Sequence, residues 1–376
     1  MSGSDSDVAA ATFDASALDS YLRDRTGRDL FAGVVRVDHD PADGRSTTVF
    51  EQGYGFASRA WQVPCTPDIR FDTASITKLF TAVATLQQVD AGAFALDTSV
   101  IEYLGLMGTK IPTTVTPYHL LTHTSGIADD ADEEDDVPYE SLFVDKPNYA
   151  LRHTIDILPN FVHKAPRFAP GEGTRYCNVA YVLLGLMVER ATGTTYREYV
   201  AEHVFARAGM TEATFASSDI VTPRIAEGAD PVHDASGHIT SWRRSIFSYP
   251  PVGAPDGGSH VTVGDLMAFH AALRNGALLS SAMTQAMFAP HEFYRKEGDS
   301  EHRTGFGFEF STTPEGEIEK YWKEGMNVGA SGILRHYPRS ELTLAILSSM
   351  EDGAWDPLVE VDRMLGVAWS RPDTID

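Results

Sequence analysis

The stretch Asp72-Thr-Ala-Ser75-Ile-Thr-Lys78-Leu-Phe-Thr-Ala-Val-Ala-Thr-Leu86 marks a change of pattern in the chain. From Ser75 onward the apolar residues recur at the spacing of an amphipathic helix. They are Ile76, Leu79, Phe80, Val83 and Leu86. Asp72 or Thr73 can cap the start of this helix, and Gly92 can end it. The stretch therefore predicts a helix whose first turn carries Ser75.

The segments before this helix and near the end of the chain have the patterns of β-strands. Residues 31–37 are rich in β-branched side chains, residues 40–44 have turn composition, and residues 47–54 alternate again, which predicts a hairpin. Near the C-terminus the predicted elements are strands at 305–310, 318–322 and 342–347 and a closing amphipathic helix at 355–369. Both ends of the chain are therefore expected to contribute to a sheet.

The middle of the chain, roughly residues 95–290, is predicted to be mostly helical. The clearest helical patterns lie at 179–191 and 263–273, and Pro- and Gly-rich loops separate them. Strands at both ends with helices between them imply one α/β domain interrupted by an α-helical insertion.

Composition excludes several classes of protein. The 376 residues are 43% apolar and 22% charged, as in ordinary globular chains, and the longest apolar stretch, 181–188, is too short to span a bilayer. A net charge of −23 opposes binding to nucleic acid or anionic lipid. Cys65 and Cys177 are too few for a disulfide framework. Residues 1–11 have neither the basic nor the long apolar segment of a secretory signal, so we expect a cytoplasmic protein.

One segment is unusually acidic. Seven of the eight residues from Asp129 to Asp136 are acidic, and we call residues 129–136 the acidic loop. A charge run of this kind is usually a solvated surface loop, which is our expectation; the alternative is a selectivity rim beside a functional site.

Ser75 and Lys78 are three residues apart, so on a helix their side chains share a face and lie within hydrogen-bonding reach. A serine hydroxyl is a weak nucleophile until a base takes its proton, and a lysine can be that base only where burial or a nearby positive charge makes it partly neutral. The helix start adds a partial positive field where an oxyanion would form. The pair predicts nucleophilic catalysis, but S-x-x-K alone is a weak signal.

Two further motifs strengthen the prediction. Tyr176-Cys-Asn178 falls at a loop-to-helix junction, where side chains can point into a cleft. For a K-x-G element the chain offers Lys296-Glu-Gly298 and Lys323-Glu-Gly325. The first lies in a charged stretch without a strand pattern, whereas the second continues an apolar strand, so we favour Lys323.

The three motifs, in this order, resemble those of the penicillin-recognising serine enzymes, which include class C β-lactamases, D,D-peptidases and related esterases, D-aminopeptidases and acyltransferases. Other segments that resemble the family are Leu120–Gly126, Pro170–Glu172, Gly257–Gly258 with 261–269, and Gly305–Phe308. The resemblance implies an antiparallel sheet flanked by helices, as in class C β-lactamases. The sheet domain would comprise residues 12–90 and 255–376, the mostly helical domain residues 91–254, and the catalytic cleft would lie between them.

The resemblance also implies roles for single residues. Ser75 would be the acylated nucleophile, Lys78 its partner, and Tyr176 a proton carrier that the charges of Lys78 and Lys323 favour as a phenolate. The implied substrate-binding residues are Asn178, Lys323, Glu324 and Gly325, with Gly325 leaving room for the acyl chain. The backbone N–H groups of Ser75 and Met326 would form the oxyanion hole. Either Lys78 or Tyr176 can be the working base, and no cofactor or metal is implied.

Histidines and cysteine near these motifs have simpler interpretations. His119 and His123 are four residues apart and could face a metal together, but their context resembles a structural turn of the family. Cys177 should point away from Tyr176 and Asn178 by alternation and pack in the core.

Glu324 departs from the family pattern. Penicillin-binding members usually carry a hydroxyl residue there that helps to hold a substrate carboxylate, and a glutamate would repel that group. We therefore expect a serine hydrolase acting on an ester or amide of a small molecule, with no nucleic-acid or membrane partner. The alternatives are an acyltransferase of secondary metabolism, a β-lactamase or D,D-peptidase, a non-catalytic binding protein and a structural assembly subunit.

Overall fold

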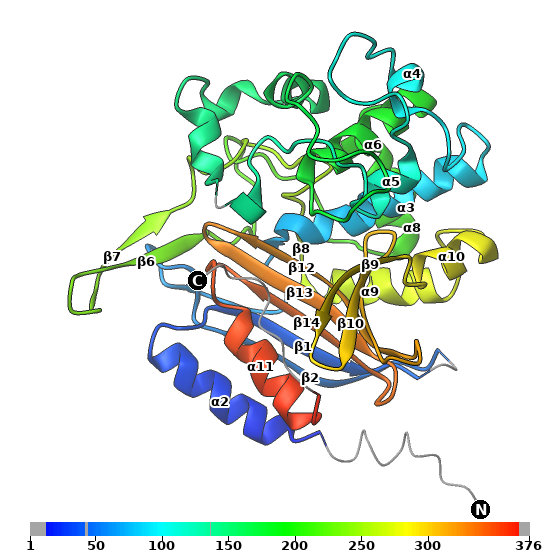
Figure 1. The fold of residues 1–376 in the computed structure, drawn as a ribbon. Coiled ribbons are helices and arrows are strands. Elements are labelled where there is room, and N and C mark those ends of the chain that lie inside the picture. The colour runs from blue at the N-terminus through cyan, green and yellow to red at the C-terminus, as the bar shows by residue number, and fades with distance from the viewer. Residues whose placement is uncertain (1–12, 42–43, 136, 368–376) are drawn as a thin grey trace, which may run out of the picture.

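The computed structural model describes residues 13–41, 44–135 and 137–367, and in this part of the chain the largest element is an eight-stranded antiparallel sheet (Figure 1). Its strand order is β2-β1-β14-β13-β12-β11-β10-β9. The bounds are β1 Gly33–His39, β2 Thr47–Tyr54, β9 Glu292–Glu297, β10 Ser300–Thr304, β11 Glu309–Thr312, β12 Ile318–Asn327, β13 Ala330–Tyr337 and β14 Leu342–Ser348. Strands from both ends of the chain thus form one sheet, because β1 pairs with β14 in the register Gly33 to Ser348. The predicted hairpin of β1 and β2 is confirmed.

Both faces of the sheet are covered. Along β1, Val34 packs into a cluster with the helices of the middle of the chain, and its neighbour Val35 packs into a second cluster on the opposite face. Helices α2 (Ala15–Gly27) and α11 (Trp355–Met364) lie side by side over the second face (Figure 1). Helices α3 (Thr77–Asp90) and α9 (Val263–Arg274) belong to the first cluster, so the start of α3 comes against the sheet.

The middle of the chain forms a helical layer above the sheet (Figure 1). Its longest helix, α6 (Asn178–Thr192), is buried from Asn178 to Val188 and ends at Gly193, whose φ of +73° suits the left-handed cap. The predicted helices at 179–191 and 263–273 are thereby confirmed. The other helices are α4 Val100–Leu104, α5 Pro117–Leu121, α7 Tyr196–Val200, α8 Ala206–Ala208 and α10 Ser281–Met287, with short 3-10 or π turns at Ala74–Ile76 (η1), Glu133–Asp135 (η2), Tyr139–Phe143 (η3), Asn148–Ala150 (η4), Thr154–Asn160 (η5) and Ala201–Phe205 (η6). The domain boundaries at 91 and 254 stay a prediction.

The described residues also form three two-stranded ladders outside the large sheet. They pair β3 (Phe56–Ser58) with β4 (Val63–Pro64), β5 (Phe71–Asp72) with β8 (His260–Val261), and β6 (Ala229–His233) with β7 (Ile239–Arg244). The β6–β7 hairpin projects from the body of the molecule (Figure 1). The β5–β8 ladder fixes the chain immediately before Ser75 beside His260.

Two strand predictions were wrong in detail. Residues 305–308 form a turn, because Gly307 has a φ of +89° that a strand does not use, and strand β11 begins only at Glu309. Phe306 and Phe308 are buried in that turn, which explains the apolar alternation. Conversely, the charged stretch around Lys296 is a strand, β9, at the edge of the sheet, where charged side chains are tolerated. Of the predicted closing helix, the end at 368–369 lies outside the described residues.

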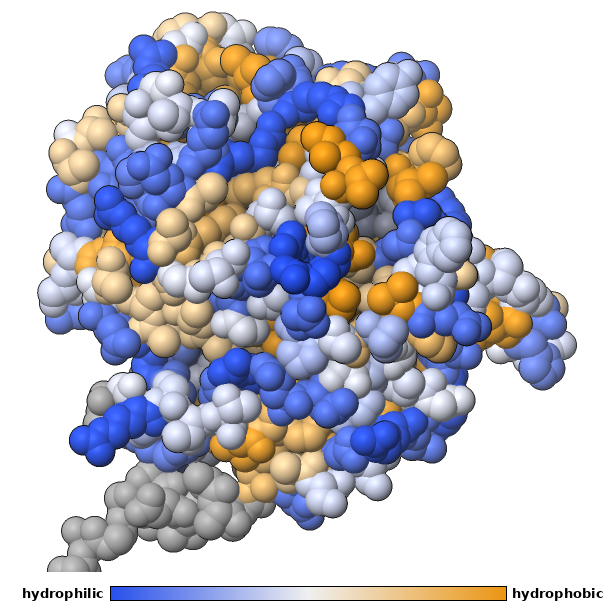
Figure 2. Space-filling model, turned by 180° about the vertical axis from the view of Figure 1, so that it is seen from behind, coloured by the Kyte–Doolittle hydropathy of each residue, from blue (hydrophilic) through white to orange (hydrophobic). Residues whose placement is uncertain are grey.

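The surface is mixed in character. Seen from behind, apolar patches are scattered among hydrophilic ones (Figure 2). Among the residues that the structure describes, no helix combines the length and apolar character needed to cross a membrane.

Candidate active site

Ser75 lies in the short turn η1, which leads directly into α3. Thr73 ties this turn to Ser259, the residue immediately before β8. The Thr73 N–H donates to the carbonyl of Ser259 at 2.8 Å, and the Thr73 hydroxyl lies 2.6 Å from the Ser259 hydroxyl. Ala74 adopts a φ of +43°, a strained conformation for a residue with a Cβ. The Ala74 N–H donates to Asp72 Oδ1 at 2.7 Å, which holds the strained turn in place.

Strand β12 presses against the same turn at Gly325. A Cβ at position 325 would lie 2.2 Å from the carbonyl oxygen of Thr73 and 2.8 Å from the backbone nitrogen of Ser75. The glycine is therefore required for the close approach of two backbones, and its expected role in leaving room for the acyl chain stays a prediction. This approach also brings Met326, the next residue of β12, to the cavity that Ser75 lines.

Lys78 is fully buried beneath Ser75. Its Nζ donates to Ser75 Oγ at 2.9 Å, to Asn178 Oδ1 at 2.6 Å and to the backbone carbonyl of Asp256 at 2.7 Å. Three acceptors match the three protons of an ammonium group. Burial nevertheless lowers the pKa of Lys78 to about 8, so a neutral amine is accessible near physiological pH. The predicted Ser75–Lys78 contact is present in the structure.

Tyr176 stands beside both proposed catalytic lysines. Its ring centroid lies 5.1 Å from Lys78 Nζ and 4.8 Å from Lys323 Nζ, and the ring of His123 packs against it at 4.6 Å. Burial, aided by repulsion from Glu133, raises the pKa of Tyr176 well above its ordinary value. The expectation that the lysines favour a phenolate was wrong, and a neutral phenol is the form that the surroundings favour.

Lys323 is buried in β12 and forms an ion pair with Glu309, at 2.7 Å between Nζ and Oε1. His302 Nε2 lies 3.0 Å from the other oxygen of Glu309. Although burial opposes ionisation, the charges of Lys323 and His302 hold the pKa of Glu309 well below its usual range. Glu309 thus balances the charge of Lys323, which explains why Lys323 does not depress the pKa of Tyr176.

Glu324 pairs across the strands with Ile333, whose side chain packs in the cluster beneath α2 and α11. Burial, followed by repulsion from Glu309, raises the pKa of Glu324 to about 7. Met326 and Asn327, but not Glu324, line the cavity at Ser75. A direct contact of Glu324 with substrate therefore stays a prediction, as does the oxyanion hole of the Ser75 and Met326 N–H groups.

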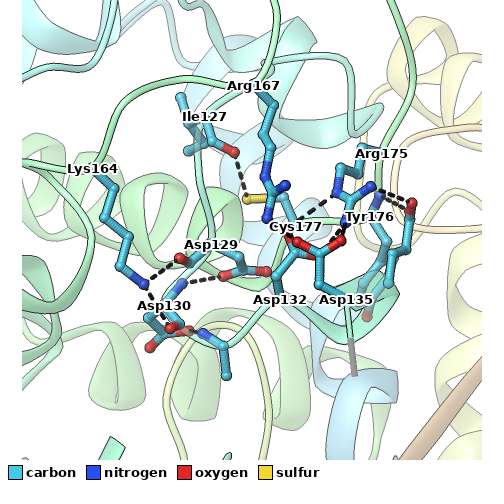
Figure 3. A network of polar contacts seen from close by, with 12 residues as sticks. Ile127, Asp129, Asp130, Asp132, Asp135, Lys164, Arg167, Arg175, Tyr176 and Cys177 are labelled. Carbon is cyan, nitrogen blue, oxygen red and sulfur yellow. Dashed lines mark hydrogen bonds and ion pairs between the residues drawn. The ribbon is translucent and has the colours of Figure 1, made fainter. Parts of the chain in front are cut away.

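The expectation that the acidic loop is solvated holds only for part of its described residues, because Glu133, Glu134 and Asp135 are exposed. Asp129, Asp130 and Asp132 are buried, and arginines and a lysine bind the loop from outside (Figure 3). Arg175 pairs with Asp132 at 2.7 Å, with Asp135 at 2.9 Å and with Glu134 at 3.0 Å. Arg167 pairs with Asp132 and Asp135, and Lys164 donates to the carbonyls of Asp129 and Asp130. These contacts fold the loop against the protein.

The acidic loop also forms hydrogen bonds with both Tyr176 and Asn178 of the Tyr176-x-Asn178 motif. Asp129 accepts the N–H groups of Asn178 and Val179 at 2.6 and 3.1 Å, so it caps the start of α6, where a carboxylate is favoured. Glu134 Oε1 accepts the N–H of Tyr176 at 3.0 Å. Glu133 Oε1 accepts from Asn178 Nδ2 at 2.7 Å, which leaves the amide oxygen of Asn178 for Lys78. The loop is thus a clamp on the motif.

A cavity of about 380 Å³ opens beside Ser75. Its lining includes Asp130, Glu133, Asn178, Asp256 and Gly257. A partly apolar hollow of this size next to a nucleophile suits a small organic substrate.

The histidine-containing groups that could bind a metal ion have other partners. His119 bonds to Thr116 and His123 accepts the N–H of Cys177, so the two histidines serve different local contacts. In the described residues, Asp40, His270 and His336 could in principle share an ion. Arg274, however, already pairs with Asp40 at 2.6 Å, and a cation would have to displace it. Cys177 packs in the core with its sulfur 3.8 Å from the carbonyl of Ile127, as predicted.

The sequence did not predict the roles of several residues of the site. Asp256 acts through its backbone carbonyl, which carries no side-chain signature. Glu309 is a single acidic residue, and Asp129 was noted only as part of the acidic loop; the partners of both lie in other segments of the chain. His123 was visible only as part of a Leu-Thr-His-Thr-Ser-Gly segment, and its stacking on Tyr176 requires the fold.

Comparison with known proteins decides the family. A family model described as Beta-lactamase matches residues 44–368. The chain belongs to the beta-lactamase family. A crystal structure of a penicillin binding protein from Bacillus halodurans is 34% identical, covers 90% of this chain and 98% of its own, and superposes with a TM-score of 0.81. The predicted class of fold, with an antiparallel sheet flanked by helices, is confirmed.

Curated relatives in the beta-lactamase family carry different names. Penicillin-binding protein 4* of Bacillus subtilis (strain 168) is 25% identical over 320 residues, 81% of this chain and 66% of that protein. Esterase EstB of Burkholderia gladioli is 30% identical over 232 residues, 58% of this chain and 57% of that protein. The chain thus spans less than two thirds of the length of either relative.

Proposed function

We propose that this protein is a serine hydrolase that cleaves an ester or amide bond of a small molecule through a covalent acyl-enzyme on Ser75. The observation that carries the proposal is the 2.9 Å contact between Ser75 Oγ and a buried Lys78 whose pKa is about 8. A lysine in this state is a general base held at the nucleophile.

The reaction follows from the protonation states. Neutral Lys78 takes the proton of Ser75 while Oγ attacks the substrate carbonyl, and the N–H groups of Ser75 and Met326 receive the negative oxygen. Tyr176, a neutral phenol in the free protein, is suited to give its proton to the leaving alcohol or amine. Water then attacks the acyl-enzyme and gives a proton to the Tyr176 phenolate, and the Lys78 ammonium returns its proton to Ser75 Oγ as the acid is released.

The names of the relatives support a hydrolase, but they differ in the substrate that they suggest. Esterase EstB favours ester cleavage, and the penicillin-binding relatives favour acylation of serine. Acyl transfer differs only in the final step, where an alcohol or amine replaces water. The acidic surroundings of Ser75 disfavour a substrate carboxylate such as that of a penicillin.

The test is intact-protein mass spectrometry after incubation with p-nitrophenyl esters, a fluorophosphonate and a penicillin. Wild type should gain one adduct that maps to Ser75, and Ser75→Ala should gain none, while the exposed Ser236→Ala control should react as wild type does. Products formed with and without acceptor alcohols separate hydrolysis from acyl transfer. Labelling that persists in Ser75→Ala, or no adduct from any probe, would refute the proposal and favour a non-catalytic binding protein.

A further inference from the structure

Among the described residues of the acidic loop, Asp129, Asp130 and Glu133 form no ion pair, and Glu133 is the exposed one of the three. Asp132, Glu134 and Asp135 all pair with Arg167 or Arg175. Glu133 forms no ion pair with any residue in the described ranges, although it is exposed and lies between paired neighbours. Its carboxylate instead bonds to Asn178 Nδ2 and lines the cavity at Ser75.

Asp256 presents to this cavity a second carboxyl that forms no ion pair in the described residues. Its backbone carbonyl binds Lys78, but its side-chain Oδ1 is buried and has no hydrogen-bond partner among the described residues. An acceptor left without a donor in a buried place is costly, and a ligand donor would remove that cost. Asp130 lines the same region, whereas the lining Arg244 is engaged by Glu227 at 3.4 Å.

The remainder of the cavity wall is mixed, with apolar side chains among polar ones such as Ser217, Tyr249 and Asn327. Phe143, Leu151, Ile157 and Ile225 line it, and Val221 and Ile246 at its rim are exposed to solvent. A ligand that fills the cavity therefore meets both carboxyl groups and hydrocarbon.

We propose that the substrate is an acyl compound that carries an ammonium group close to the scissile carbonyl and a bulky apolar group beyond it, and that Glu133 selects the ammonium group. This inference rests on the proposed function, because it places the cation beside a carbonyl attacked by Ser75. Glu133 touches the substrate in this scheme and is a specificity residue. The net charge of −23 favours the approach of such a cation over long distances.

The experiment compares two anilides of matched shape. Phenylalanine p-nitroanilide, in both D and L forms, carries the ammonium group, and 3-phenylpropionyl p-nitroanilide has hydrogen in its place. Wild type should prefer the charged substrate, and Glu133→Gln should lower its kcat/KM by about 10- to 100-fold, as expected for loss of one charge-assisted hydrogen bond. Any effect on Asn178 and Lys78 should change both anilides alike, so the ratio of kcat/KM for the charged anilide to that for the neutral one should fall in Glu133→Gln. Glu133→Asp should recover part of the preference of the wild type, and added salt should weaken that preference. The control Glu315→Gln removes an exposed charge in the turn between β11 and β12 and should behave as wild type.

A second readout does not depend on turnover. 2-Phenylethylammonium should slow fluorophosphonate labelling of Ser75 more than 2-phenylethanol does, and Glu133→Gln should abolish that difference. Equal loss of both anilides in Glu133→Gln would show that Glu133 acts through Asn178 on Lys78, and would overturn the inference, as would equal protection by the amine and the alcohol. If Ser75 is labelled but neither anilide is cleaved, the inference is judged by the protection experiment: stronger protection by the amine than by the alcohol supports it, and equal protection overturns it. If no probe labels Ser75, the proposed function fails and this inference falls with it.

Discussion

Replacing Gly325 by alanine tests whether β12 holds the turn that carries Ser75. The added Cβ would meet the carbonyl oxygen of Thr73 at 2.2 Å, the nitrogen of Ser75 at 2.8 Å and the Cβ of Ala74 at 3.1 Å. The first two are backbone atoms, so no side chain can rotate out of the way. The strand or the turn must move.

The size of the effect follows from these distances. To bring the closest contact to 3.0 Å, the two segments must separate by about 0.8 Å, which is the difference between 3.0 and 2.2 Å. Overpacking of this kind typically costs about 1–3 kcal/mol of folding stability. A displacement of about 1 Å at a reacting group can cost about 100-fold in rate. We therefore expect Gly325→Ala to lose about 100-fold in the rate of Ser75 acylation while the protein still folds.

The assay is the rate of fluorophosphonate labelling of Ser75, followed by mass spectrometry, beside the midpoint of thermal unfolding. The matched control is Gly27→Ala in α2, where a Cβ would meet no atom within 4 Å. That control should label at the wild-type rate and unfold at the same or a higher temperature. Wild-type labelling and an unchanged unfolding midpoint in Gly325→Ala would refute the close approach of β12 to the turn.

Two other predictions concern Lys78 as the general base and Asp129 of the acidic loop as the cap of α6. The kcat/KM for a p-nitrophenyl ester should rise about tenfold per pH unit up to about pH 8 and then level, because only neutral Lys78 can accept the proton of Ser75. A rise that continues beyond pH 10 would identify Tyr176 as the base, since burial raises the pKa of that phenol. Asp129→Ala should lower the free energy of unfolding in urea by about 2 kcal/mol, because two N–H groups at the start of α6 lose their acceptor. The exposed Asp97→Ala should change the free energy of unfolding by less than about 0.5 kcal/mol, and an equal loss in both variants would contradict the capping role.

The part of the site that could be predicted from the sequence depends on short-range geometry. Ser75 lies in η1 and Lys78 in the first turn of α3, which continues directly from η1, so their contact follows from near-helical spacing. Tyr176 and Asn178 lie at a helix start whose pattern is clear, and Lys323 lies in a strand whose apolar neighbours identify it. The sheet built from both ends of the chain was predictable for the same reason, because alternation marks each strand locally.

The rest depends on contacts between distant segments. The acidic loop has the composition of a solvated segment, and its burial depends on Arg167, Arg175 and the start of α6, all more than thirty residues away. Charge counts do not specify which arginine meets which carboxylate. The balance of Lys323 by Glu309 depends likewise on how β11 meets β12, so the raised pKa of Tyr176 could not be deduced from the two lysines alone.

The same carboxylates link substrate choice to catalysis. Asp256 and Glu133 attract the proton on Lys78, and they partly offset the burial that lowers its pKa. A substrate ammonium group placed between them would neutralise that attraction and repel the lysine proton as well. Binding of the proposed cationic substrate would therefore lower the pKa of Lys78 further, and the base would be most active when the substrate is present. A neutral substrate leaves the carboxylates unbalanced and Lys78 more protonated, so the acidic cavity would discriminate in the chemical step as well as in binding.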